Sequence, residues 1–351
     1  MKHSAQRDQQ ITRLLSRWFR THARDLPWRR KRTGYRALVA ELMLQQTQVA
    51  RVLEHYVPFL KRFPSLRALA EADEQEVLAH WQGLGYYRRA RHLHAAARAV
   101  MSAHRGRLPR SAAALESLPG VGRYTAGAIA SIVHDEPVPI VDGNVTRVLS
   151  RIEGRQGPAH DTKGQAAIWS IAERLVSRAE SPGVFNEALM ELGAIICTPR
   201  APRCSECPLA SHCRAYGDRT QHLIPPPKPT ARRNVIHHHA VVFRRGDRIL
   251  LEQRPDRGLW AAMWQVPTVE AENELTTDHL RAALPYPAVH LEPRTTFLHE
   301  TTHRRVTFHV YLGTTRVRRG VWQPVRQLNE RPLSNPQRFI VKTILHEANV
   351  G

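Results

Sequence analysis

The cysteines constrain this chain more than any other residue type. All four lie in one short stretch, with the spacing Cys197-x6-Cys204-x2-Cys207-x5-Cys213. A disulfide framework spreads its cysteines through a small secreted chain, whereas a tight group in a long chain is typical of a metal or cluster site. Four thiolates suit both a tetrahedral zinc ion and a four-iron cluster. The spacing therefore predicts a metal centre in a reducing compartment and leaves the metal open.

The net charge indicates the kind of partner. Lys and Arg number 52 against 31 Asp and Glu, which gives a formal net charge of +21. Such an excess favours a polyanion, most simply nucleic acid bound through its phosphates. Residues 1–20 lack the apolar core of a secretory signal, and no apolar run is long enough to cross a bilayer. We therefore expect a cytoplasmic protein with no membrane partner.

The length of 351 residues and the patterning predict two domains. From Ile11 to about Ala215 the apolar residues recur with a helical period, and loops with Pro or Gly separate the helices. Ile224–Pro229 has four prolines in six residues, which favours an extended linker. We expect an all-α domain, a linker and an α+β domain over residues 1–221, 222–233 and 234–351.

The C-terminal part has the two-residue period of strands. Residues 239–243 and 248–253 predict two strands joined by the turn 244–247, and residues 305–313 predict another strand. The run His237–His239 lies at a strand start inside the chain, and we interpret it as neither a tag nor a metal site.

Three local features suggest chemistry. Gly120 and Gly122 precede a helix after a Pro-Gly turn, and their backbone amides suit a phosphate-binding nest, although any loop between helices can contain such a turn. Asp142 is either the N-cap of a helix near Val145 or a functional carboxylate. Glu41 has apolar neighbours in a predicted helix. A surface glutamate is the common alternative, but desolvation there favours the protonated form that a general acid needs.

Together these motifs resemble a known family. The cysteine spacing, the hairpin and the Asp142 loop resemble the endonuclease III superfamily of DNA glycosylases. The segments 26–29, 41–48 and 83–87 identify the chain as a member of the MutY family of A/G-specific adenine glycosylases. The Glu-x-Met-x-Gln-Gln-Thr run within 41–48 separates this family from its pyrimidine-excising relatives. The resemblance covers about residues 8–220 strongly and the C-terminal region more loosely.

The resemblance implies a fold, a cofactor and a function. The fold is multidomain: an all-α helix-hairpin-helix glycosylase domain, with a [4Fe–4S] cluster loop at 197–213, followed by an α+β Nudix-like domain that recognises 8-oxoguanine. The cluster is favoured over zinc and has a structural role, holding a basic loop against phosphates. The function is base excision repair on double-stranded DNA, in which adenine opposite 8-oxoguanine or guanine is flipped out and cut from its sugar. We expect a monomer associated with the nucleoid of a bacterial-type cell.

The resemblance also implies catalytic roles. Glu41 protonates N7 of adenine and then activates water, Asp142 stabilises the oxocarbenium-like sugar, and Asn144 orients Asp142. Lyases of the superfamily carry an amine nucleophile just after the hairpin. That position resembles Tyr124 here, so the resemblance implies a monofunctional hydrolase with at most weak lyase activity.

Binding residues follow in the same way. Gln46 and Tyr86 are implied to wedge the duplex, although both also suit packing. The hairpin grips the DNA backbone without reading sequence. The implied contacts of the hairpin are Gly120, Val121 and Gly122, and those of the adenine pocket are Arg24, Leu26, Trp28, Arg29 and Glu187.

One segment departs from the family pattern. The family's sensing loop reads Phe-x-His-x-Phe-Ser-His, and this chain has Phe297-Leu298-His299-Glu300-Thr301-Thr302-His303. Thr302 and His303 keep polar groups for the edge of 8-oxoguanine, whereas Thr301 replaces an aromatic ring and loses any stacking. The alternative is a polar turn between strands.

Three other functions stay open at this point. A glycosylase/lyase for oxidised pyrimidines has the same fold, and an iron–sulfur DNA-binding sensor would not need both Glu41 and Asp142. A Nudix hydrolase would need Gly-x5-Glu-x7-Arg-Glu-x2-Glu-Glu to hold Mg²⁺. The C-terminal region lacks that pattern, so we discount hydrolysis there.

Overall fold

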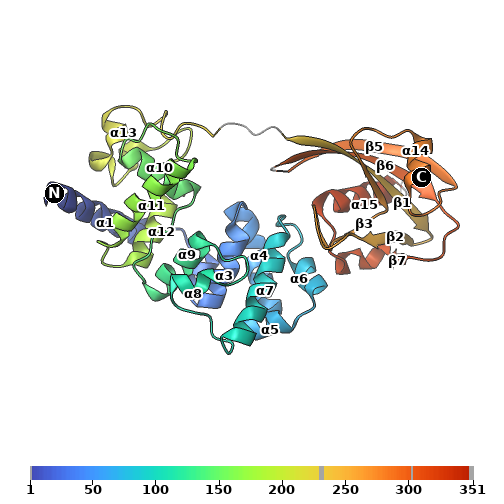
Figure 1. Cartoon of the computed structure of the whole chain (residues 1–351), viewed down its shortest axis with the longest axis horizontal. Coiled ribbons are helices and arrows are strands. Elements are labelled where there is room, and N and C mark those ends of the chain that lie inside the picture. Colours follow the sequence, from blue (N-terminus) through green and yellow to red (C-terminus); the bar gives the residue numbers. More distant parts are fainter. Residues whose placement is uncertain (1, 229–232, 302, 348–351) are drawn as a thin grey trace. The chain divides into compact units, whose positions relative to one another are not determined.

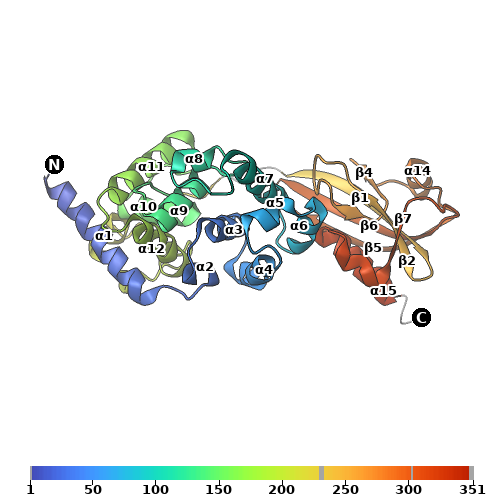
Figure 2. The same cartoon turned by 90° about the horizontal axis from the view of Figure 1, so that it is seen from below.

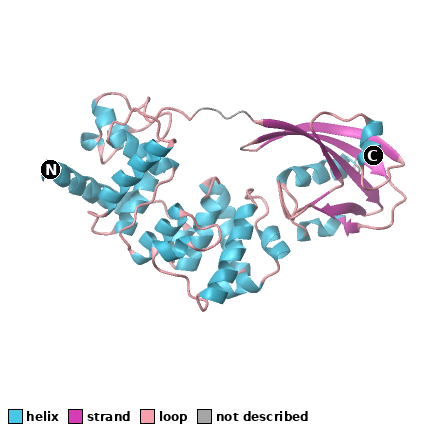
Figure 3. Cartoon of the chain, viewed as in Figure 1, coloured by secondary structure: helices cyan, strands magenta, loops and turns pink. Residues whose placement is uncertain are grey.

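The computed structural model describes residues 2–228, 233–301 and 303–347. Helices make up the N-terminal part, and strands occur after residue 233 (Figure 3). The chain divides into two compact units: Met1–Glu71 with His92–Pro229, and Ala72–Arg91 with Thr230–Gly351. The second unit thus includes a short piece of the helical region. The boundaries inferred from the sequence, at residues 221 and 234, stay a prediction.

The helical region agrees with the all-α prediction. Its helices are α1 (Lys2–His22), α2 (Pro27–Arg30), α3 (Gly34–Leu44), α4 (Val49–Arg62), α5 (Leu66–Glu71), α6 (Glu74–His80), α7 (Arg88–Ala103), α8 (Ala112–Glu116), α9 (Arg123–His134), α10 (Gly143–Ile152), α11 (Thr162–Val176), α12 (Pro182–Ile195) and α13 (Arg214–Gly217). The short 3-10 helices Cys204–Glu206 and Ala210–His212 lie in the cysteine loop.

One hydrophobic core fixes the helices that carry the acidic residues. The buried face of α1, with Ile11 and Leu15, packs with Leu149 of α10 and Leu189 of α12. Both views of the chain show α1 running beside α12 (Figures 1 and 2). Apolar residues at helical spacing on each helix are buried together, and this sets where α10 begins and which way α12 faces.

The turn between α8 and α9 depends on one glycine. Gly120 has a φ of 73°, and a Cβ built there would lie 2.3 Å from the Cβ of His92. Neither the left-handed backbone nor the close approach accommodates another residue. The Pro-Gly turn predicted between two helices is therefore present, and Gly122 forms the N-cap of α9.

The second unit contains a mixed sheet. Its order is β3-β2-β1-β6-β5, with β4 paired to β1 and β7 paired to β2; β1 and β6 are parallel, and the other pairs are antiparallel. The three predicted strands are confirmed as β1, β2 and β6. The bounds are β1 (Asn234–Arg245), β2 (Arg248–Gln253), β3 (Trp264–Gln265), β4 (Thr268–Ala271), β5 (His290–Glu300), β6 (Arg304–Thr314) and β7 (Val321–Pro324).

Both faces of this sheet are covered. Ala240 and Val242 of β1 pack with Ile340 of α15 (Asn335–Glu347), whereas Val241 packs with Leu280 of α14 (Thr277–Ala283). The two helices lie on opposite sides of the sheet (Figure 1). Successive side chains of a strand point to opposite faces, so a strand buried on both sides is apolar throughout its centre. Among the described residues, no helix has the length and apolar character needed to cross a membrane.

Candidate active site

Glu41 lies in the middle of α3 with only 7% of its surface exposed. The pKa of its carboxyl group is raised to about 7, mainly by burial. The hydrogen bond with Tyr124 and the charge of Arg29 lower this pKa, and the negative charges of Asp142 and Glu187 raise it. One carboxyl oxygen, Oε2, is buried without a hydrogen-bond partner among the described atoms. Glu41 therefore has both a buried free oxygen and a proton near neutral pH, as a general acid requires.

Asp142 lies at the N-terminus of α10, where its carboxylate both caps the helix and lies near Tyr124 and Glu41. Its Oδ1 accepts a hydrogen bond from the Val145 amide at 2.7 Å, so it is the N-cap. Its Oδ2 accepts one from Asn144 Nδ2 at 3.3 Å. Burial raises the pKa of Asp142, and these hydrogen bonds and the charge of Arg147 lower it. The cap thus fixes the carboxylate in place and Asn144 contacts it, whereas the catalytic roles of both residues stay predictions.

Tyr124 completes the group around Glu41. Burial and the charges of Glu41 and Asp142 raise the pKa of its phenol well above the usual value. Its hydroxyl also donates to the sulfur of Met190 at 3.2 Å. Three elements, α3, α9 and the start of α10, therefore bring Glu41, Tyr124 and Asp142 together, although they are far apart in the sequence.

Two buried acids of α12 lie beside the α1–α3 connection. Glu191 accepts hydrogen bonds from Arg24 Nε at 2.8 Å and from Arg29 Nη2 at 3.0 Å. Its pKa falls to about 2, because these arginine hydrogen bonds outweigh its burial. Glu187 pairs with Arg29 at 3.2 Å and Arg32 at 2.6 Å, yet burial raises its pKa. The structure thus brings Arg24, Arg29 and Glu187 to one site.

The remaining predicted pocket residues lie on the same connection. Leu26 is buried, and it precedes α2. Trp28 is half-buried, and its ring meets Tyr56 edge to face with 5.4 Å between the centroids. Both side chains have packing partners, so their structural role is clear, and their contact with adenine stays a prediction.

Gln46 and Tyr86 share an unusual backbone. Their φ angles are 54° and 46°, and both side chains are exposed. Left-handed backbone costs about 1 kcal/mol in residues other than glycine and is found often at functional sites. Gln46 belongs to the first unit and Tyr86 to the second. Each is presented to solvent rather than packed in a core, and insertion of the two side chains into DNA stays a prediction.

The hairpin residues divide between packing and exposure. Val121 is buried and donates its amide to the Leu118 carbonyl at 3.1 Å, so it stabilises the turn. Gly120 and Gly122 are exposed, and a Cβ at Gly122 would have no atom within 4 Å. The open backbone at the start of α9 is the part of the turn that is accessible to a phosphate.

The four cysteines line one pocket and are half-buried. The pKa of the Cys207 thiol is raised to about 12, mainly by burial and also by the other three cysteines, although the Leu209 amide lowers it. Four thiolates are therefore stable together only around a cationic centre. Four thiolates suit both a tetrahedral zinc ion and a four-iron cluster. The shared pocket therefore fits a metal centre held by all four cysteines.

The predicted sensing loop is only partly described. Thr302 lies outside the described residues, and His303 is exposed in the turn between β5 and β6. Thr301 and Arg304 close this turn, because the Thr301 amide donates to the Arg304 carbonyl at 2.9 Å. Thr301 and Arg304 thus pair where β5 ends and β6 begins, and contact of this segment with DNA stays a prediction.

Comparisons with known sequences agree with this geometry. Residues 39–178 match the HhH-GPD superfamily base excision DNA repair proteins, 197–213 match the iron–sulfur binding domain of endonuclease III, and 238–343 match the NUDIX domain. The mouse adenine DNA glycosylase is 38% identical over 354 residues, which cover 84% of this chain and 68% of the mouse protein.

This chain belongs to the adenine DNA glycosylase family. The human member is 38% identical over 84% of this chain, and the match spans 65% of the human protein. The member from Buchnera aphidicola subsp. Schizaphis graminum is 31% identical, with 75% of this chain and 76% of that protein covered. The predicted fold, the glycosylase activity and the [4Fe–4S] cofactor are confirmed by these matches.

Two solved structures share their fold with part of this chain. A thermostable thymine-DNA glycosylase is 29% identical with a TM-score of 0.56, and the match covers 61% of this chain and 99% of that chain. A trapped endonuclease III–DNA covalent intermediate is 23% identical with a TM-score of 0.50, covering 60% of this chain and 98% of its own. The second likeness concerns the fold alone.

In this family member, two arginines missed by the sequence reasoning connect the active site to the cluster loop. Arg147 donates to Asn144 Oδ1 at 2.8 Å and to the Cys197 carbonyl at 2.7 Å. Arg151 donates to the Cys197 sulfur at 3.3 Å. Glu191 was missed as well. Their partners are remote in the sequence, so local reasoning could not find these contacts. The one local indication was that both arginines lie on α10, four residues apart and thus on one face of the helix.

Proposed function

We propose that this chain removes adenine from duplex DNA where adenine is opposite 8-oxoguanine or guanine. The observation that carries the proposal is Glu41, a buried carboxyl group with a pKa near 7 beside Asp142 and Tyr124. The mouse relative is an adenine DNA glycosylase, and this chain matches both the base excision DNA repair superfamily and the NUDIX domain. We also propose that the protein acts as a monomer in the cytoplasm, at the nucleoid, where its net charge of +21 favours DNA.

The proposed reaction uses the two carboxyl groups differently. Adenine leaves poorly as an anion, so Glu41 transfers its proton to N7, and the base departs neutral. The C1′–N9 bond breaks, and the electron pair leaves with adenine. Asp142 offsets the positive charge that develops on the sugar. Ionised Glu41 then takes a proton from the water that attacks C1′, and this restores its starting state.

The surrounding residues support this division of roles. The Asp142 carboxylate is held by the Val145 amide and Asn144, so it does not need to reorient as the charge develops. Tyr124 occupies the position after the hairpin and has no amine to form a Schiff base with the sugar. We therefore propose hydrolysis with at most weak lyase activity.

Substrate selection is tested by comparing duplexes. We expect excision of adenine opposite 8-oxoguanine and guanine, and none of an oxidised pyrimidine. Borohydride reduction is expected to trap little covalent adduct, because the site lacks a positioned amine. Efficient excision of the oxidised pyrimidine, or strong trapping, would assign the chain to the lyase alternative.

The pH dependence of excision follows from Glu41. The protonated form is active, and its pKa is about 7, so the single-turnover rate is expected to fall about tenfold per pH unit above that value. Measuring the rate at saturating enzyme between pH 5 and pH 9, roughly the range in which such a group titrates, gives the midpoint. A rate that stays level through pH 9 excludes Glu41 as the acid.

The opposite-base preference is predicted to depend on the loop after β5. In the double variant Thr302→Ala/His303→Ala, the preference for 8-oxoguanine over guanine is expected to fall by about 1–3 kcal/mol, the worth of one good base-edge contact. Excision is measured at limiting enzyme on both duplexes. The matched control is Thr277→Ala/His279→Ala on α14, where both side chains are exposed.

Deletion of residues 234–351 tests the whole C-terminal part less cleanly. We expect residual adenine excision with a lower preference for 8-oxoguanine. However, Gln75 accepts a hydrogen bond from Trp264 at 3.0 Å, and residues 72–91 form one compact unit with the strands. The deletion therefore also uncovers that segment. A full-length protein without preference, or a deletion that keeps it, contradicts the sensing role.

A further inference from the structure

The exposed face of α1 carries a row of arginines that the active site does not use. Arg13, Arg17 and Arg20 are separated by four and three residues, so the helix places them on one stripe. All three are exposed, whereas Ile11 and Leu15 on the opposite face are buried. At a rise of 1.5 Å per residue, the stripe is about 10 Å long.

This row lines a cleft in the first unit. The other lining residues include glutamines of α1 and, between α11 and α12, Arg178, Glu180 and Ser181. Four arginines thus share the cleft with one carboxylate. Among the described residues, neither Arg13, Arg17 nor Arg20 forms an ion pair or a side-chain hydrogen bond, so their charges are available to a ligand.

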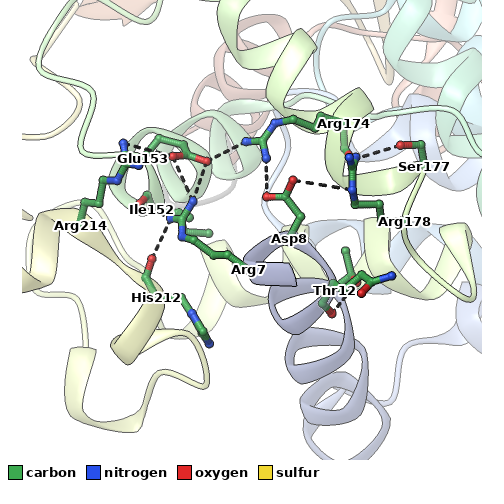
Figure 4. A network of polar contacts seen from close by, with 11 residues as sticks. Arg7, Asp8, Thr12, Ile152, Glu153, Arg174, Ser177, Arg178, His212 and Arg214 are labelled. Atoms are coloured by element: carbon green, nitrogen blue, oxygen red, sulfur yellow. Dashed lines mark hydrogen bonds and ion pairs between the residues drawn. The ribbon is translucent and has the colours of Figure 1, made fainter. Parts of the chain in front are cut away.

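The helix that carries the row is fixed in place (Figure 4). Buried Asp8 pairs with Arg174 and lies 3.9 Å from Arg178 Nε, and these contacts join α1 to α11. Arg7 donates to the His212 carbonyl at 2.9 Å, which joins α1 to the cluster loop. The backbone of the arginine row is therefore held before any ligand binds, and a ligand has only the side chains to order.

The spacing and chemistry of the row fit a phosphate backbone. A guanidinium group donates two parallel hydrogen bonds to a phosphate. Phosphates of one DNA strand advance about 3.4 Å along the axis, so the stripe spans roughly three of them. The C-terminal end of α1 leads to Arg24, whose side chain contacts Glu191 in the active site. Along the sequence, the row therefore ends four residues before Arg24.

We propose that Arg13, Arg17 and Arg20 bind phosphates of the duplex that flanks the target base. This rests on the proposed function, because it supposes that the chain binds duplex DNA. The contacts position the protein on DNA without reading its sequence, as phosphate contacts do.

The test is the salt dependence of DNA binding. The ligand is a duplex with an abasic-site analogue opposite 8-oxoguanine, and the variant is Arg13→Gln/Arg17→Gln/Arg20→Gln in the full chain. Each phosphate contact adds about 0.9 to the slope of log Kobs against log salt, so the slope is expected to fall by about 2–3. The affinity near 0.1 M salt is expected to fall about tenfold or more.

Two control variants separate a local contact from general charge. Arg316→Gln/Arg318→Gln/Arg319→Gln removes the same charge from an exposed loop of the second unit and is expected to keep the slope. The triple Arg-to-Lys variant of the row keeps the positive charge and is also expected to keep the slope of the salt dependence. Thermal melting reports whether each variant is folded.

The outcomes are distinct. An unchanged slope in the Gln row variant overturns the proposal and leaves an acidic protein segment as the partner of the cleft. An equal fall of the slope in the loop control also overturns the proposal, because the effect would then come from the net charge of the protein rather than from contacts of the row. Excision by the unaltered protein on an adenine–8-oxoguanine duplex tests the proposed function separately. If the slope falls in the Gln row variant but the unaltered protein excises no adenine, the phosphate contacts of the row are supported and the proposed enzyme activity is contradicted.

Discussion

Glu41→Gln is expected to lower the single-turnover rate of adenine excision by about 10²–10⁴-fold, because glutamine has the shape of the acid without a transferable proton. Asp142→Asn is expected to cause a loss of similar size, since the negative charge near the sugar is removed. Both variants should retain duplex binding, because neither residue is placed among the phosphate contacts. Quenched excision and equilibrium binding on one duplex measure the two effects separately.

Folding is controlled by matched substitutions. Asp161→Asn alters another N-cap, whose Oδ1 accepts from the Gly164 amide in α11, and Glu116→Gln alters an exposed carboxylate of α8. Both are expected to excise adenine normally. Asparagine is itself a good N-cap, so Asp142→Asn should keep α10 intact. Near wild-type excision by either active-site variant would refute the two-carboxylate assignment.

The free energy of unfolding gives an independent test of the protonation state of Glu41. Its folded pKa of about 7 lies above the ordinary value of 4.5, so burial of the ionised form costs stability as the pH rises through this range. Glutamine carries no charge. At a pH about one unit above the folded pKa, Glu41→Gln is therefore expected to raise the free energy of unfolding by up to about 3 kcal/mol. A less stable variant would show that Glu41 is ionised and paired.

Cys204→Ser is expected to remove the cluster and, with it, most of the affinity for DNA. The unaltered protein should be yellow-brown and hold about four iron atoms per chain. Cys204 lies in a loop with little regular structure, in which short 3-10 helices separate the cysteines, so the loop depends on the cluster for its shape. Loss of the cluster is expected to weaken duplex binding about tenfold or more, because phosphate contacts of the loop are lost.

The control for this variant is Ser205→Ala. Ser205 is the exposed neighbour of Cys204 and should leave colour, iron content and binding unchanged. Iron, sulfide and zinc are measured on the same samples as the absorbance. A colourless protein with one zinc ion, or a Cys204→Ser variant that keeps full iron and affinity, would contradict the role given to the loop.

The sequence alone was enough for features that depend on neighbours in the chain. The cysteine spacing predicted a metal centre, and its resemblance to the endonuclease III superfamily indicated the cluster. The apolar residues around Glu41 predicted the burial that the structure shows. The position of Asp142 before a helix predicted either an N-cap or a functional carboxylate, and the family resemblance implied the second role. The strands β1, β2 and β6 followed from their period. Local propensity and patterning act over a few residues, and these features are local.

Only the tertiary structure decided which remote residues meet. The Arg24–Glu191 pair joins residues separated by 167 positions, and the Arg147–Cys197 contact joins residues separated by 50. The parallel pairing of β1 with β6 and the grouping of residues 72–91 with the strands are of the same kind. The sequence pattern of charged side chains does not predict which residues form ion pairs. Those pairs are set when α1, α10 and α12 pack into one shared hydrophobic core. The sequence thus determined the chemical groups and their local elements, and packing determined their distances, burial and pKa values.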